Sequence, residues 1–257
     1  MSIWSNIRGI FNINTAIVTI LAVISTYLCI IFELYAEFPL TLLGIAVVFP
    51  IVFSIGTAYA RREKALNHYS SLKAYGRAIY FASRDWTPKT DKKFQNRLKK
   101  ILFTILVACR ELFRTLREDR NKDERLVYTK FSELSHYMEE CRSRGMTNSE
   151  VSRANQHLSK MLEAFENLKH IYQYRTPVTL RAYSKVFIYV LPIAYGPYFA
   201  HLALEVPTML IFVMPILFSI ILVSLDNIQE HLENPFDQVG EDDVRINAEK
   251  FIRRLDL

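Results

Sequence analysis

The chain has 257 residues, of which 51% are hydrophobic and 23% are charged, and its formal net charge is +6. That length allows one or two domains with a sizeable buried core. The three cysteines, Cys29, Cys109 and Cys141, are an odd number in apolar or helical surroundings. This favours reduced packing residues over a disulfide framework or a metal site.

Four long runs of the chain contain no charged residue: residues 9–32, 38–60, 186–204 and 206–225. A helix needs about 20 residues to cross the hydrocarbon core of a bilayer, and each run is of that order. Four such runs are hard to place in a soluble chain. We therefore predict an all-α integral membrane protein with four transmembrane helices in two hairpins. The first run is not a cleavable signal peptide, because only Arg8 precedes it and a second run follows almost at once.

The charges that flank these runs predict their orientation. Acidic residues stand in the two short connections, namely Glu33, Glu37 and Glu205. Basic residues follow the second run and precede the third, among them Arg61, Arg62, Arg181 and Lys185. The positive-inside bias places both termini and the middle of the chain in the cytoplasm. The same residues are the candidate charges at the outer and inner mouths of any ion pathway.

The chain between the hairpins is charged and reads as a helical bundle. We expect an N-terminal transmembrane hairpin in 1–60, a cytosolic helical domain in 61–182, a second hairpin in 183–225 and a cytosolic tail in 226–257. Four apolar seams with gaps of three and four residues support the bundle. The seams are Ala65, Tyr69, Leu72, Gly76 and Ile79; Phe94, Leu98, Ile101, Ile105, Ala108 and Leu112; Val127, Phe131, Leu134, Met138 and Cys141; and Val151, Ala154, Leu158, Met161, Phe165, Leu168 and Tyr172.

Three local signals refine this reading of the middle region. Thr147 with Glu150 is typical of a capping box that opens the last helix. Trp86-Thr87-Pro88 predicts the end of the helix that continues the second span. The run ILFTILVAC at 101–109 is too short to span a membrane and is expected inside the bundle, with a re-entrant segment as the alternative.

The sequence carries no recognisable catalytic motif. It has no glycine-rich phosphate loop, HExxH, CxxC or nucleophile elbow, and its six histidines are scattered without ligand spacing. The basic residues of the middle region are interleaved with acids, whereas nucleic-acid binding needs a one-sided basic patch. We therefore expect neither an enzyme nor a nucleic-acid partner, and no cofactor. Pumps usually need ionisable groups inside the membrane, which these runs lack, but an oligomeric pore with apolar walls does not.

The stretch GIAVVFPIVFSIGTAY at 44–59 contains a ridge of Ile45, Phe49 and Phe53, each four residues after the last. In a helix this spacing places the three side chains on one face. Periodicity alone favours ordinary helix packing for such a ridge.

Two segments resemble the bestrophin family of ion channels: LLGIAVVFPIVFSIGTAYARREKALNHY at 42–69 and LDNIQEHLENPFDQVGEDD at 225–243. The order of two spans, a helical block, two spans and a tail is also similar to that family. The resemblance implies a homopentamer around one axial pore, with three apolar residues of the second span forming its narrow neck. On this sequence those positions are Ile45, Phe49 and Phe53. It also implies permeation by inorganic anions such as chloride, and contact with membrane lipid.

The acidic run after Asn-Pro-Phe departs from the pattern of animal bestrophins, which bind calcium there. Four residues intervene before Glu241, Asp242 and Asp243, and the run is shorter. This argues against a calcium site, although these three residues stay its candidates. The short chain resembles prokaryotic or organellar relatives, which implies a bacterial inner membrane or an organellar membrane.

Two other functions stay open at this point. A non-conducting scaffold would use the helical bundle to bind a partner protein, and its Phe49 ridge would pack against lipid or neighbouring helices. A small-solute transporter is the third alternative.

Overall fold

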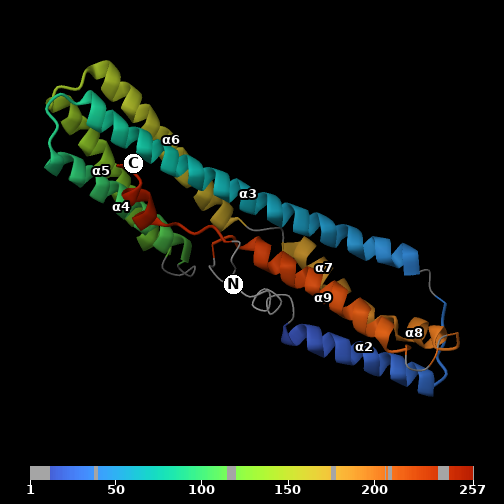
Figure 1. Cartoon of the computed structure of the whole chain (residues 1–257). Coiled ribbons are helices and arrows are strands. Elements are labelled where there is room, and N and C mark those ends of the chain that lie inside the picture. The colour runs from blue at the N-terminus through green and yellow to red at the C-terminus, as the bar shows by residue number, and fades with distance from the viewer. Residues whose placement is uncertain are drawn as a thin grey trace. The chain divides into compact units, whose positions relative to one another are not determined.

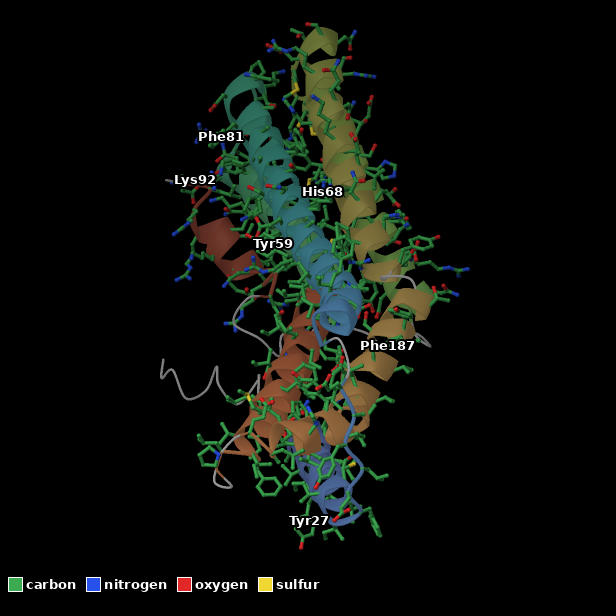
Figure 2. All side chains as sticks on the ribbon, turned by 90° about the vertical axis from the view of Figure 1, so that its right-hand side faces the viewer. Tyr27, Tyr59, His68, Phe81, Lys92 and Phe187 are labelled. Atoms are coloured by element: carbon green, nitrogen blue, oxygen red, sulfur yellow. The ribbon has the colours of Figure 1, made fainter. Side chains whose placement is uncertain are left out.

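The computed structural model describes residues 12–37, 40–114, 120–174, 178–205, 207, 210–236 and 243–256. Within these ranges the chain is helical and contains no strand, which confirms the all-α prediction. The chain divides into two compact units. Unit 1 comprises Met1–Ala60 and Arg175–Asn234, and unit 2 comprises Arg61–Tyr174 and Pro235–Leu257. The side chains of unit 2 carry many nitrogen and oxygen atoms at their tips, whereas carbon dominates those of unit 1 (Figure 2).

Unit 1 is built from α2 (Ile13–Ile31), the first part of α3 (Leu40–Trp86), α7 (Val178–Ala194), α8 (Gly196–Leu202) and α9 (Val213–Glu233) (Figure 1). A capping box begins α2, because the Asn12 side chain accepts from the Thr15 amide and the Thr15 side chain accepts from the Asn12 amide. All five helices contribute to one apolar core. Its buried members are Val18, Ile51, Ile188, Leu191, Tyr195, Phe199, Leu222 and Val223.

The third uncharged run does not form one continuous helix, as a simple span would. It is divided at Tyr195 between α7 and the short helix α8, with Pro197 in the first turn of α8. Proline at that position fits the start of a helix, because its missing N–H has no partner there. Gly196 lies so close to α2 that a Cβ atom would stand 2.3 Å from the Ser25 hydroxyl oxygen. Ser25 in turn donates to the Ile193 carbonyl oxygen (2.8 Å), which ties α2 to the end of α7.

Two of the described helices, α2 and α9, have the length and apolar composition needed to cross a membrane. They coincide with parts of the first and fourth uncharged runs. Helix α7 has 17 residues and shares its uncharged run with α8. The four-span topology therefore stays a prediction.

Unit 2 contains the rest of α3 together with α4 (Lys92–Arg114), α5 (Arg120–Ser143), α6 (Asn148–Gln173) and α10 (Ala248–Arg253). The four predicted seams form its core: all their members are buried except Leu158 and Tyr172, which are partly buried. Most of the run at 101–109 is buried within α4, so it belongs to the bundle. The helix boundaries at Trp86 and Thr147, and the capping box of Thr147 with Glu150, are as predicted.

The C-terminal segment, expected as a tail, packs into this bundle. Its buried apolar residues join the core of unit 2, and they are Phe236, Val244, Ile246, Ala248, Phe251 and Leu255. Phe236, from the Asn-Pro-Phe motif, stacks on Phe113 of α4 with ring centroids 4.7 Å apart. The motif thus marks the position where the chain enters the bundle core.

Candidate functional site

The predicted ridge on α3 lies exposed in the single chain. Ile45, Phe49 and Phe53 are 63%, 61% and 56% exposed, which is unusual for three large apolar side chains on successive turns. They stand within a wider apolar face of α3. The other exposed residues of this face include Val48, Val52 and Tyr59, of which Tyr59 is labelled in Figure 2.

The opposite face of the same helix carries its packing. Ile51, Ser54 and Ala58 are buried, and Ile51 belongs to the core of unit 1. At about 100° per residue, these three positions lie across the helix from Phe49. Among the described residues, the ridge is therefore not used for packing within the chain. It is available to a second copy, to lipid or to a permeation path.

The ridge is internally ordered. The rings of Phe49 and Phe53 meet edge to face with centroids 4.5 Å apart. This arrangement lets the positive edge of one ring approach the negative face of the other. One turn later, the Thr57 hydroxyl donates to the carbonyl oxygen of Ser54 (2.8 Å) and lies 3.0 Å from that of Phe53. At Gly56 a Cβ atom would meet no atom within 4 Å, so the face stays open beside the ridge.

The three acidic candidates for the outer mouth are exposed residues of unit 1. Glu33 follows α2 and adopts a positive φ of 54°. Glu37 lies 3.0 Å from the His201 side chain of α8, so its charge has a neighbour when that imidazole is protonated. Glu205 lies in the turn after α8.

Two of the basic candidates for the inner mouth are engaged in unit 2. The Arg61 guanidinium donates to the carbonyl oxygens of Ile171 and Tyr174 at the end of α6. These are carbonyls that a helix end leaves without intrahelical partners, so Arg61 acts as a C-cap. Arg62 forms an ion pair with Glu63 (2.8 Å). The side chain of Arg181 lies outside the described residues.

Lys185 belongs to a polar cluster between α7 and α9. Its ammonium group forms an ion pair with Glu230 and lies near Asp226. The Tyr189 hydroxyl donates to Asp226 (3.2 Å), and Glu230 and Glu233 lie near it as well. Asp226 is only 1% exposed, although it follows the last uncharged run directly. Sequence reasoning placed Lys185 at a mouth and missed this cluster. The i, i+4 spacing of Asp226 with Glu230 and of Lys185 with Tyr189 is its only sequence signal.

A second buried polar contact joins α2 to α9. The Asn12 side-chain amide donates to Asn227 (2.8 Å), and Asn227 lies 3.4 Å from the Thr15 hydroxyl. Asn227 is buried, and this contact contributes hydrogen bonds to its side chain, as buried polar groups require. No motif in the sequence indicates it.

The calcium candidates are not brought together by the described structure. Glu241 and Asp242 lie outside the described residues, and Asp243 is the first residue after that gap. Within the described ranges, no group of three or more His, Cys, Asp or Glu side chains is placed to hold a metal ion.

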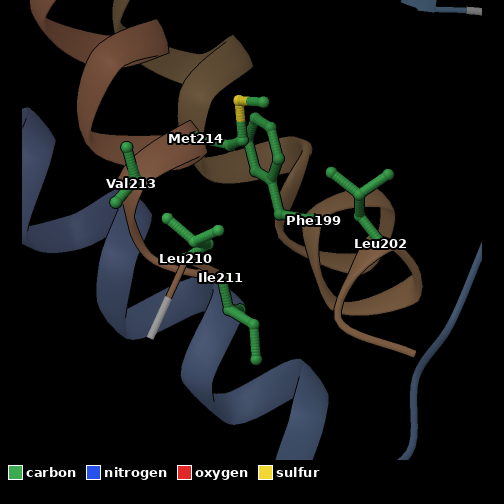
Figure 3. Close-up of a pocket in the computed structure, with 6 residues that line it drawn as sticks. All are labelled: Phe199, Leu202, Leu210, Ile211, Val213 and Met214. Carbon is green, nitrogen blue, oxygen red and sulfur yellow. The ribbon is translucent and has the colours of Figure 1, made fainter. Parts of the chain in front are cut away.

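An apolar pocket of about 120 Å³ lies between α8 and the start of α9 (Figure 3). Its lining residues are Phe199, Leu202, Leu210, Ile211, Val213 and Met214. None of them offers a charged or polar side chain, so the pocket has no group with which to bind an ion or to carry out chemistry.

Comparison with solved structures gives a clear likeness. A crystal structure of a bacterial bestrophin homologue from Klebsiella pneumoniae superposes with a TM-score of 0.79 at 16% identity, and covers 93% of this chain and 96% of that chain. A mutant of the same homologue gives a TM-score of 0.80 at 16% identity, with coverages of 93% and 96%. A structure described as a membrane protein variant gives 0.81 at 15% identity, with coverages of 95% and 98%.

The chain has a bestrophin-like fold. At 15–16% identity the likeness rests on structure. The similarity in sequence is correspondingly low. No protein-family model matches the sequence, and no curated protein matches it. The likeness extends over 93–95% of the chain.

The Lys185 cluster gives a first prediction. Lys185→Met removes the cation that pairs with Glu230 and lies near buried Asp226, and leaving these acids without that cation costs about 1–3 kcal/mol. We expect a lower thermal midpoint for the purified full-length protein in detergent. Adding Asp226→Asn should restore part of that loss.

Lys64→Met is the matched control, because Lys64 is an exposed lysine with no ion pair among the described residues. An equal loss in both single variants, or no recovery in the Lys185→Met/Asp226→Asn double variant, would contradict the assignment.

Proposed function

We propose that this chain is one subunit of a bestrophin-like ion channel, rather than an enzyme, with Ile45, Phe49 and Phe53 as its pore neck. The observation that carries the proposal is the exposed apolar face of α3. Its three ridge residues are more than half exposed, while Ile51 on the other side of the helix is buried. The bestrophin-like fold over nearly the whole chain supports the same assignment.

The proposed topology has four spans in two hairpins. We place the first hairpin in 1–60, the cytosolic helical domain in 61–182, the second hairpin in 183–225 and the cytosolic tail in 226–257. Both termini are cytoplasmic, in a bacterial inner membrane or an organellar membrane. The length and composition of α2 and α9 support two of the spans. The exposed apolar residues of α2, among them Ile17, Ile20 and Ile24, suit contact with lipid.

A pore requires several copies of the chain. One helix face cannot surround an axis, but copies related by rotation can each contribute the same ridge to a closed wall. Five copies is the number that the bestrophin resemblance implies. The exposed face of α3 then lines the axis, and its packed face holds each ridge on the core of its own subunit.

The physics of such a neck follows from its side chains. Stacked apolar rings exclude water when the passage is narrow and admit it when the passage widens slightly, which gates ion flow by dewetting. Phenyl rings present positive edges, and these tolerate an anion better than a cation. The edge-to-face contact of Phe49 with Phe53 shows that one ring can turn its edge toward its neighbour. We assign selectivity to this dehydrating neck.

The mouth charges are assigned a smaller role. Rings of Glu33, Glu37 and Glu205 would enrich cations at the outer mouth, but exposed charges are screened over about 8 Å at physiological salt. On the inner side, Arg61 caps α6 and Lys185 pairs with Glu230, so both charges are partly compensated. These residues tune conductance and leave the choice of ion to the neck.

The proposed pore requires the chain to assemble into a ring. Native mass spectrometry of the protein in detergent should show a homo-oligomer with five copies as its main species. A predominantly monomeric protein would contradict the channel proposal, and a stable ring of another size would contradict only the number five.

The neck prediction concerns ion flux. Replacing Ile45, Phe49 and Phe53 together by Ala should widen and wet the constriction and raise ion flux into liposomes. The assembly should persist, because in the proposed pore these side chains face the axis and do not pack between subunits. The control replaces Ile17, Ile20 and Ile24 of α2, which are exposed apolar residues of another helix. If the ridge instead packs between subunits, its truncation should cost about 2–5 kcal/mol per large side chain and abolish the oligomer without a gain of flux.

The selectivity prediction is tested by the reversal potential across a planar bilayer under a potassium chloride gradient. We expect a value near the chloride equilibrium potential. A value near the potassium equilibrium potential would refute the anion assignment and leave the channel intact. Absence of current from well-folded oligomers would favour the non-conducting scaffold instead.

A further inference from the structure

The row of side chains that forms the ridge on α3 continues beyond Phe53. The next position at the same spacing of four residues is Thr57, which is exposed as the ridge residues are. Residues four apart lie at neighbouring positions of one helix face. Thr57 is thus the first polar side chain in a row that is apolar from Ile45 to Phe53.

The hydroxyl group of Thr57 has a defined orientation. It donates to the carbonyl oxygen of Ser54 (2.8 Å) and lies 3.0 Å from that of Phe53, both in the preceding turn of α3. A hydroxyl group has one hydrogen to donate and two lone pairs with which to accept. Since its hydrogen is directed at the helix backbone, the Thr57 oxygen offers acceptor capacity, and no donor, to whatever faces it.

The exposed side of Thr57 is open within the part of the chain that the structure describes. Tyr59 and Ala60 near it are exposed, and a Cβ atom on Gly56 would meet no other atom within 4 Å. One turn further along α3, the Arg61 guanidinium donates to the carbonyl oxygens at the end of α6. The row therefore passes from three apolar side chains to an accepting oxygen before it reaches a charge.

We propose that Thr57 is a specificity-determining residue of the pore, at which an accepting oxygen ends the apolar neck and favours cations. The inference rests on the proposed channel, in which copies related by rotation turn the whole row toward one axis. Hydroxyl oxygens coordinate cations and accept hydrogen bonds from water through their lone pairs. An anion instead needs a donor, and the Thr57 hydrogen would have to leave the backbone to supply one. Thr57 thus opposes the anion preference of the phenyl edges.

Thr57 also sets the length of the dehydrating segment. The apolar row rises about 12 Å from Ile45 to Phe53, at 1.5 Å per residue of α3. Thr57→Val would lengthen this row by one more step of four residues, or about 6 Å. A longer apolar wall is harder to wet, so ions cross it more slowly.

Planar-bilayer recordings of the full-length protein under a potassium chloride gradient test the inference. Thr57→Val keeps the shape of the side chain and removes its oxygen. We expect the conductance to fall by about threefold or more, and the permeability of chloride relative to potassium to rise by about the same factor. Thr57→Ser keeps the hydroxyl group and should retain the conductance and the reversal potential of the parent.

The matched control is Thr129→Val in α5. The Thr129 hydroxyl is exposed and donates to the Arg125 carbonyl oxygen (2.9 Å), so this change removes the same kind of side-chain-to-backbone bond in unit 2. Thr129→Val should alter the thermal midpoint about as little as Thr57→Val does, with no change in conductance or reversal potential. An effect on ion flow that appears only at position 57 therefore belongs to the pore.

Three results would overturn the inference. The first is a reversal potential of Thr57→Val that is unchanged or shifted toward the potassium equilibrium potential, and the second is an equal change in Thr57→Ser. The third is loss of the Thr57→Val oligomer in native mass spectrometry, which would make Thr57 a packing residue between subunits. Each of them leaves the channel intact if the parent conducts. Absence of current from the assembled parent would refute the channel and this inference together.

Discussion

The organisation of much of this molecule depends on a single buried stripe of residues on α3. Its members follow each other at gaps of three or four residues, except for one gap of seven: Ile51, Ser54, Ala58, Ala65, Tyr69, Leu72, Gly76 and Ile79. In unit 1, Ile51 of the stripe belongs to the core that α2, α7, α8 and α9 share with it. In unit 2, the apolar residues of the stripe belong to the core of the bundle. Within the gap of seven, Arg61 donates to the end of α6. This side of α3 is committed to packing, whereas the other side near Phe49 stays exposed among the described residues.

The sequence predicted the bundle well because its signals are local and repeated. A heptad seam such as that from Phe94 to Leu112 indicates at every turn which side of the helix is buried. All six of its residues are buried in the structure. The Thr147 capping box depends on two residues three positions apart. The exposed ridge was also visible as a spacing, but whether it packs depends on neighbours that no spacing identifies.

What the sequence did not predict depends on contacts between distant segments. The division of the third run at Tyr195 requires Gly196 to fit against Ser25 of α2. The role of Arg61 depends on where α6 ends, and the burial of Asp226 depends on Tyr189 and Lys185 of another helix. The C-terminal segment appeared to be a charged tail, yet its apolar residues alternate from Val244 to Ala248 and are buried in the bundle core. In each case the residue type alone permits several environments.

Packing within one subunit constrains the residue at position 196 but not the residue at position 56, although both are glycine. At position 196 a Cβ atom collides with Ser25 inside the same chain, so packing within one subunit favours glycine there. At position 56 a methyl group would meet nothing within 4 Å, so folding of one subunit does not select for glycine. Glycine weakens a helix by roughly 0.5–1 kcal/mol relative to alanine. If glycine is nevertheless conserved at position 56 among relatives, the reason lies in a close contact with another molecule, such as a neighbouring subunit. Conservation at this position would then be evidence for the assembly.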